Sequence, residues 1–120
     1  MGAHSWAENI EPLVNDYYIY SFDNIGEGNK SDLSDALIFP QTGKEIADLY
    51  ASLLDSLNID KAPVFGASNG GFIAQMLAYH HPEKVESLLL FGPMGLTQLT
   101  EGSIFMMTIV SLYPFHFMRD

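Results

Sequence analysis

The chain has 120 residues, the size of one domain, and its 15 acidic against 5 basic residues give a net charge of −10 at pH 7. A surface of that sign repels phosphate backbones and anionic lipids, which argues against nucleic acids and membranes as partners. The chain has no cysteine, so disulfides, thiolate nucleophiles and cysteine metal sites are excluded. The N-terminal residues lack the basic and apolar stretches of a signal peptide, which predicts a cytoplasmic protein.

The N-terminal third predicts a short helix, a strand and a long loop. Ser5 and Glu8 have the spacing of a capping box, and apolar residues follow at helical intervals up to Val14. Residues 17–23, YYIYSFD, are rich in aromatic and β-branched side chains, so we expect a strand there. Residues 24–41 combine glycines, a proline and several Asp and Ser residues, which predicts a loop.

A second capping box, Thr42 to Glu45, begins the helix with the clearest pattern. Apolar side chains recur behind it at helical spacing and predict its buried face. These residues are Ile46, Leu49, Tyr50, Leu53, Leu54 and Leu57. We therefore expect a long amphipathic helix after residue 42.

Strands and helices alternate through the next part of the chain. Residues 62–67, APVFGA, predict a buried strand, and Gly70–Tyr79 predict a helix that ends before Pro82. Residues 85–91, VESLLLF, predict a second buried strand. This alternation favours an α/β fold, with a parallel sheet and helices on both of its faces.

The C-terminal stretch, residues 102–118, is almost wholly apolar. Pro114 interrupts it, and it is shorter than the roughly 20 residues that a membrane-spanning helix needs. We therefore expect a helix that is covered by other protein rather than a membrane anchor.

The sequence Gly66-Ala67-Ser68-Asn69-Gly70 stands between a predicted strand and a predicted helix. A serine on so sharp a bend is exposed at the end of its strand, as a nucleophile elbow requires, and Gly66 and Gly70 leave room for the turn. The N–H of Asn69 then points toward negative charge on an attacked carbonyl. The alternative is a glycine-rich turn with a capping serine, as in nucleotide-binding proteins. The spacing is not GxGxxG and no Walker lysine follows, so phosphate binding has little support.

With this motif the chain resembles the α/β-hydrolase superfamily, from Ser5 to about Thr100. Residues 23–31, DNIGEGNKS, are similar to the family's D-x-x-G-x-G-x-S segment. They have one extra residue before the serine, and Ile25 stands where the family usually has arginine. Residues 80–93 resemble the strand that follows the nucleophile helix, and residues 92–97 resemble the entry into a helical cap.

The resemblance implies a serine hydrolase in which Ser68 attacks a carbonyl and Asn69 N–H forms half of an oxyanion hole. It implies a small acyl substrate, such as a carboxylic ester, and no cofactor or metal. A lipase-like esterase, a thioesterase, a peptidase and a hydrolase of carbon–carbon bonds beside carbonyls all remain open. A serine nucleophile argues against the haloalkane dehalogenase and epoxide hydrolase relatives, whose nucleophile is a carboxylate.

In this family the catalytic residues follow one another along the chain as serine, acid and histidine. No acid and histidine after Ser68 fit these two roles convincingly. The acids after it are Glu83, Glu86, Glu101 and Asp120, and the histidines are His80, His81 and His116. Neither these histidines nor His4 suits the role, so we expect the catalytic acid and histidine to be absent.

We therefore expect this chain to be the central part of a hydrolase and to be inactive by itself. Residues 1–100 would form part of the α/β-hydrolase core, and residues 101–120 the beginning of a helical cap. Exposed strand edges and apolar faces would then favour self-association or a complementing chain. The alternative is a non-catalytic relic or interaction module that exposes an apolar surface.

Overall fold

The structure is a computed structural model that describes residues 6–24 and 40–95. Its elements in chain order are α1 (Ala7–Ile10), α2 (Gly43–Ser56), β1 (Ala62–Ala67), α3 (Asn69–His80), the 3-10 turn η2 (Pro82–Lys84) and β2 (Val85–Phe91). Most of the predicted loop 24–41 and the predicted cap residues 101–120 lie outside the described residues.

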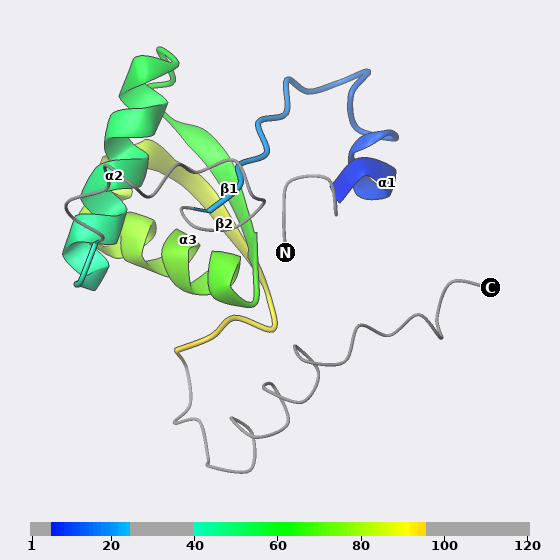
Figure 1. Ribbon diagram of the computed structural model, residues 1–120. Helices are drawn as coiled ribbons and strands as arrows, with labels where there is room; N and C mark the ends of the chain where they lie inside the picture. The colour runs from blue at the N-terminus through cyan, green and yellow to red at the C-terminus, as the bar shows by residue number, and fades with distance from the viewer. Residues whose placement is uncertain (1–5, 25–39, 96–120) are drawn as a thin grey trace, which may run out of the picture.

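The two strands form a parallel sheet, and α3 is the crossover between them (Figure 1). Val64 is in register with Leu88, and Ala67 with Phe91. Helices α2 and α3 lie together on one side of this sheet (Figure 1). On the opposite side of β1, the rings of Trp6 and Phe65 meet edge to face, with centroids 4.9 Å apart. The predicted partial α/β fold with a parallel sheet is confirmed.

Small residues set the distance between α2 and α3. Ala47 and Ala51 of α2 are buried, as is Ala74 of α3. At Gly43, a Cβ atom would lie 2.4 Å from the sulfur of Met76, so this end of α2 rests directly on α3. Side chains this small let the two helix backbones approach closely.

The predicted apolar face of α2 is only partly correct. Leu54 is buried in a cluster with Ala51 and Leu77, but Leu49 and Leu57 are 38% and 36% exposed. The face that packs on α3 is formed by Ala47, Ala51 and Leu54. Large side chains at the edges of that face remain half exposed.

The capping box at the start of α2 is confirmed. The backbone N–H of Glu45 donates to Thr42 Oγ1 at 3.2 Å, and the N–H of Thr42 donates to Glu45 Oε2 at 3.0 Å. The N–H of Gln41 donates to the same carboxylate oxygen at 2.6 Å. These bonds to the charged form lower the pKa of Glu45 and fix where α2 begins.

Two N-terminal predictions are wrong. The first helix ends at Ile10 rather than Val14, because Pro12 has no N–H with which to continue the helical hydrogen bonds. Residues 17–24 form no strand in the structure. Their far end is tied to α2 instead, since the rings of Phe22 and Tyr50 lie 6.4 Å apart. A strand requires a hydrogen-bonding neighbour, and no described strand lies beside this segment.

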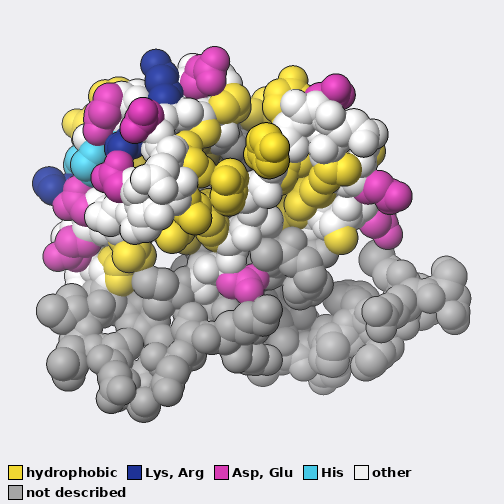
Figure 2. Space-filling view, turned by 90° about the horizontal axis from the view of Figure 1, so that it is seen from above, with side chains coloured by type: hydrophobic (Ala, Val, Ile, Leu, Met, Phe, Trp, Pro, Cys, Tyr) yellow, Lys and Arg dark blue, Asp and Glu magenta, His cyan; other side chains and the backbone are white. Residues whose placement is uncertain are grey.

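Part of the apolar surface of the described residues is open. Tyr79, Phe91 and Leu89 are 77%, 74% and 65% exposed. Figure 2 shows hydrophobic side chains gathered in the middle of one face, with acidic side chains around them. None of the described helices has the length and apolar character needed to cross a bilayer.

His81, the residue after α3, contacts the carboxylates of Asp48 in α2 and Glu83 in η2. Its Nε2 lies 2.7 Å from Asp48 Oδ1, and its Nδ1 lies 3.1 Å from Glu83 Oε1. Asp48 also accepts from Lys44 Nζ at 2.6 Å, and Lys84 pairs with Asp55 nearby. A neutral imidazole has one N–H, so only the imidazolium can donate to both carboxylates. The hydrogen bond to Asp48, more than that to Glu83, raises the pKa of His81.

We expect this contact to make the free energy of unfolding depend on pH. The His81 contribution is fully present below its ordinary pKa of 6.5 and is lost as pH rises through the raised value of the folded state. The pKa of Asp48 is lowered by its bonds to Lys44 and then His81, so its contribution is present above its ordinary pKa of 3.8. Urea unfolding at about pH 5.5 and pH 8 should therefore show greater stability at the lower pH.

The variant His81→Gln should lose most of that difference. His80→Gln is the matched control, because the His80 ring packs against Tyr79, with centroids 4.8 Å apart, instead of between carboxylates. An equal pH dependence in the parent chain and in His81→Gln would contradict this prediction.

Candidate active site

Ser68 lies on the sharp turn between β1 and α3. Its backbone angles are φ 51° and ψ −119°, in the region that favours glycine, and a non-glycine residue there costs about 1–3 kcal/mol. The strand ends at Ala67 and α3 begins at Asn69, so the turn has a single residue. The Ser68 side chain makes no capping hydrogen bond to α3. The structure therefore does not support the alternative of a capping serine.

Both backbone groups of Ser68 are held by hydrogen bonds. Its N–H donates to Phe91 O at 3.1 Å, at the end of β2. Its carbonyl accepts from Phe72 N at 3.2 Å and from Met94 N at 3.0 Å. The unfavourable conformation persists because α3, β2 and the residues after β2 all constrain it.

The glycines around Ser68 differ in what they allow. At Gly66 a Cβ would lie 2.4 Å from Gly70 O, so the strand end requires glycine. At Gly70 a Cβ would meet no described atom within 4 Å, so the expectation that Gly70 provides room for the turn is not supported. The close contact is at Gly71, where a Cβ would lie 2.7 Å from Pro93 Cβ. Sequence reasoning missed Gly71, although the consecutive glycines were a signal.

Asn69 is the first residue of α3, and its backbone N–H is one of those that a helix leaves without an internal partner. The first helical hydrogen bond runs from Phe72 N to Ser68 O. The N–H of Ser68 is already used, so Asn69 N–H is the group next to the serine that can receive a developing oxyanion.

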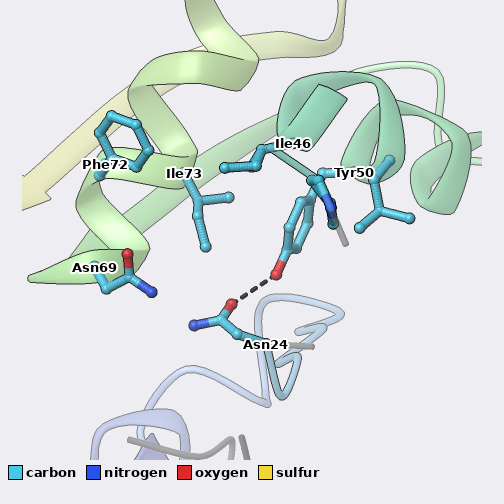
Figure 3. A pocket seen from close by; sticks show the side chains of 8 residues that line it. Asn24, Ile46, Tyr50, Asn69, Phe72 and Ile73 are labelled. Atoms are coloured by element: carbon cyan, nitrogen blue, oxygen red, sulfur yellow. Dashed lines mark hydrogen bonds between the residues drawn. The ribbon is translucent and has the colours of Figure 1, made fainter. Parts of the chain in front are cut away.

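A small pocket adjoins the elbow on the side of α2. Its volume is about 150 Å³, and Asn69 lies on its rim (Figure 3). The rest of its lining is Asn24, Pro40, Ile46, Leu49, Tyr50, Phe72 and Ile73. Tyr50 Oη donates to Asn24 Oδ1 at 2.6 Å across its lower edge. A space this small can hold one group the size of a benzene ring.

The described histidines lie far from Ser68. His80 ends α3 and His81 follows it, whereas Ser68 precedes the same 12-residue helix. At about 1.5 Å per residue the two ends are roughly 20 Å apart. Glu83 follows the same end of α3, and Glu86 lies at the start of β2, away from Phe91. None of these four side chains is brought to the serine.

The remaining candidates, His4, Glu101, His116 and Asp120, lie outside the described residues. Among the residues that the structure describes, no group of three or more His, Asp or Glu side chains could hold a metal ion. The site as described therefore comprises the elbow, the Asn69 N–H and the adjoining pocket.

The two neighbouring glycines give a matched pair of variants. Gly71→Ala places a methyl group against Pro93 and should destabilise the chain by about 1–3 kcal/mol. Gly70→Ala adds a methyl group to open space in a helix and should stabilise it by up to about 1 kcal/mol. Urea denaturation of both variants measures the difference, and equal effects would contradict the assignment of the close contact to Gly71.

The sequence is similar to those of known α/β-hydrolase proteins. The family model described as alpha/beta hydrolase fold matches residues 1–117. Over 98 residues the chain is 34% identical to 2-hydroxy-6-oxo-6-phenylhexa-2,4-dienoate hydrolase of Comamonas testosteroni, covering 79% of this chain and 34% of that protein. Over 91 residues it is 32% identical to the dihydrolipoyllysine-residue acetyltransferase component of the acetoin cleaving system of Cupriavidus necator. That match covers 76% of this chain and 23% of the relative.

Solved structures are similar in fold. A serine hydrolase from the polyaromatic hydrocarbon-degrading bacterium Cycloclasticus zankles superposes with a TM-score of 0.68 at 29% identity, covering 85% of this chain and 37% of that one. A hydrolase from Pseudomonas aeruginosa PA01 superposes with a TM-score of 0.69 at 24% identity, covering 92% of this chain and 40% of that one. The chain thus spans well under half the length of these proteins. Because the family model matches nearly all of its residues, the chain belongs to the α/β-hydrolase fold family.

Proposed function

We propose that Ser68 is the nucleophile of a serine hydrolase that acts on carboxylic esters or related acyl compounds. The observation that carries this proposal is the conformation of Ser68, with φ 51° and a hydroxyl that does not cap the helix behind it. Strain of this kind persists at functional sites because it holds a side chain where the reaction needs it. Glycine adopts this conformation without strain, so a residue that served only to turn the chain would more readily be glycine.

The chemistry follows from the two groups at the elbow. Ser68 Oγ attacks the carbonyl carbon of the substrate, and the carbonyl oxygen gains negative charge in the tetrahedral intermediate. The N–H of Asn69 and the positive end of the α3 dipole stabilise that charge. The intermediate collapses with cleavage of the ester C–O bond, and the alcohol leaves with the proton that came from Ser68 Oγ. The acyl group stays on Ser68 as an ester until water releases it as the carboxylic acid.

The proton of Ser68 Oγ has to be accepted by a base, and the described histidines are at the other end of α3. We therefore propose that the catalytic histidine and acid belong to parts of the whole protein other than the described residues. The chain spans 34% of its Comamonas relative, which leaves ample length for them in a complete enzyme. The 120 residues alone should retain only the weak reactivity of a serine beside one oxyanion donor.

A second candidate reaction is hydrolysis of a carbon–carbon bond beside a carbonyl. Its support is the similarity to the Comamonas hydrolase and to 2-hydroxymuconate semialdehyde hydrolase of Pseudomonas sp. strain CF600, at 33% identity over 100 residues. Both names describe carbonyl compounds, and an attack by Ser68 on a carbonyl serves either reaction. Assay of the whole protein with a p-nitrophenyl ester and with a 2-hydroxy-6-oxo-dienoate distinguishes them.

The non-catalytic alternative, an interaction module, draws on the exposed Tyr79, Leu89 and Phe91. It makes no use of the strained Ser68, so reactivity of that serine decides between a hydrolase and an interaction module.

The predicted cytoplasmic location and self-association stay predictions.

We expect a fluorophosphonate probe to label the folded 120-residue chain slowly at Ser68, and Ser68→Ala to abolish the labelling. Without a base near the serine, the labelling rate should rise by about tenfold per pH unit between about pH 6 and 9, following the alkoxide fraction. Ser52→Ala, at an exposed serine of α2, is the control and should label like the parent chain.

A plateau in rate above about pH 7 would instead indicate a histidine base within the chain. Labelling that is absent at every pH, or that persists in Ser68→Ala, would contradict the proposal that Ser68 is the nucleophile. Membership of the fold family does not depend on either result.

A further inference from the structure

The residues that follow β2 lie directly against the first turns of α3. Pro93 contacts the helix where Gly71 has no side chain, since a Cβ at Gly71 would lie 2.8 Å from Pro93 Cα. Gly95 has φ +91°, and a Cβ there would lie 2.9 Å from the ring of Phe72. We call residues 93–95 the elbow strap, because they cross the helix beside Ser68.

Both backbone groups of Met94, in the middle of the elbow strap, are hydrogen bonded to this part of α3. Its N–H donates to Ser68 O at 3.0 Å. Its carbonyl accepts from Gln75 Nε2 at 3.3 Å, and the same nitrogen donates to Gly71 O at 3.0 Å. The Gln75 side chain is part-buried in both contacts. Met94 is therefore held between the serine and the glutamine.

The peptide bond between Ser68 and Asn69 gives these contacts a chemical consequence. A peptide unit is planar, so the direction of the Ser68 carbonyl fixes the direction of the Asn69 N–H. Met94 N–H therefore orients the proposed oxyanion donor when it binds the Ser68 carbonyl. The bond from Phe72 N to the same oxygen, at 3.2 Å, acts in the same sense.

We infer that Gln75 is a positioning residue for the reaction of Ser68, acting through Met94 and the Ser68–Asn69 peptide. This inference rests on the proposed function of Ser68. A glutamine suits the role because its Nε2 carries two N–H groups, one for each of the carbonyls of Gly71 and Met94. An ionised glutamate of the same shape has only acceptors and would repel both carbonyls, and a methionine would bind neither.

The test compares Gln75→Glu and Gln75→Met with Ser56→Ala. Ser56 is the matched control, because Ser56 Oγ donates to Ser52 O at 2.8 Å, four residues back on α2 and away from the elbow. Hydrogen exchange by NMR should show roughly 2- to 12-fold less protection of the Met94 N–H in the Gln75 variants, the range expected for one lost hydrogen bond. The Asn69 N–H resonance should shift in the same variants, and neither change should appear in Ser56→Ala.

The second measurement is the reaction of Ser68 with the fluorophosphonate probe. Because Asn69 N–H acts on the transition state, the maximal labelling rate should fall by up to about tenfold while the concentration of probe for half-maximal rate stays the same. Urea unfolding of each variant separates this effect from a loss of folded protein. If Gln75→Glu does not fold, Gln75→Met decides the question.

Unchanged Met94 exchange and an unchanged Asn69 resonance in the Gln75 variants would overturn the inference. It would equally be overturned if Met94 exchange rose but labelling fell no more than in Ser56→Ala. A parent chain that shows no labelling at all would refute the proposed function of Ser68, and the role of Gln75 in catalysis with it. In that case altered Met94 exchange would show only that Gln75 holds the elbow strap in place.

Discussion

The close approach of the first turn of α3 to the end of β1 is the constraint on which the rest of the structure depends. A Cβ at Gly66 would lie 2.4 Å from Gly70 O, so strand and helix nearly touch at their junction. This distance leaves one residue, Ser68, to reverse the chain direction, and no ordinary conformation can do so. The strained serine is thus a consequence of how tightly α3 folds back onto the sheet.

Small residues continue this close packing along α3. Gly71 admits Pro93 on one side, and Ala74 is buried further along the helix. Ala47 and Ala51 bring α2 against it in the same way. Contacts between such small residues fix the distance between the helices but bury little apolar surface. Burial of apolar surface is the main source of stability. Polar contacts at the ends of the helices, such as the capping box at Thr42, therefore matter more here than in a larger core.

The sequence was informative where structure depends on neighbouring residues, and uninformative where it depends on distant ones. The strands 62–67 and 85–91 have the predicted bounds, and α3 extends only one residue beyond its prediction at each end. These elements carry their own apolar runs, and glycine follows the second strand while proline stands just beyond α3. Residues 17–23 have an equally good strand pattern, but a strand also needs a neighbour, which local composition cannot reveal.

The same distinction applies to the site. Ser68 was predictable because an elbow is built from a few consecutive residues. The contacts of Gln75 and Gly71 with the elbow strap join residues about twenty positions apart, and no spacing rule indicates them. The alanine face of α2 was missed for another reason. Hydrophobic periodicity gives most weight to large side chains, whereas close helix packing selects small ones.

Helix α3 separates the two kinds of chemistry in the described residues. Its N-terminus carries Ser68 and the Asn69 N–H, where the helix dipole favours negative charge. Its C-terminus carries His81, where the same dipole favours positive charge and two carboxylates face the ring. An imidazolium between carboxylates about 20 Å away cannot accept a proton from Ser68. Among the described residues, the ionic contacts of His81 with Asp48 and Glu83 therefore lie at the end of α3 away from the elbow. A base for the proposed nucleophile would therefore have to come from residues other than those at the C-terminal end of α3.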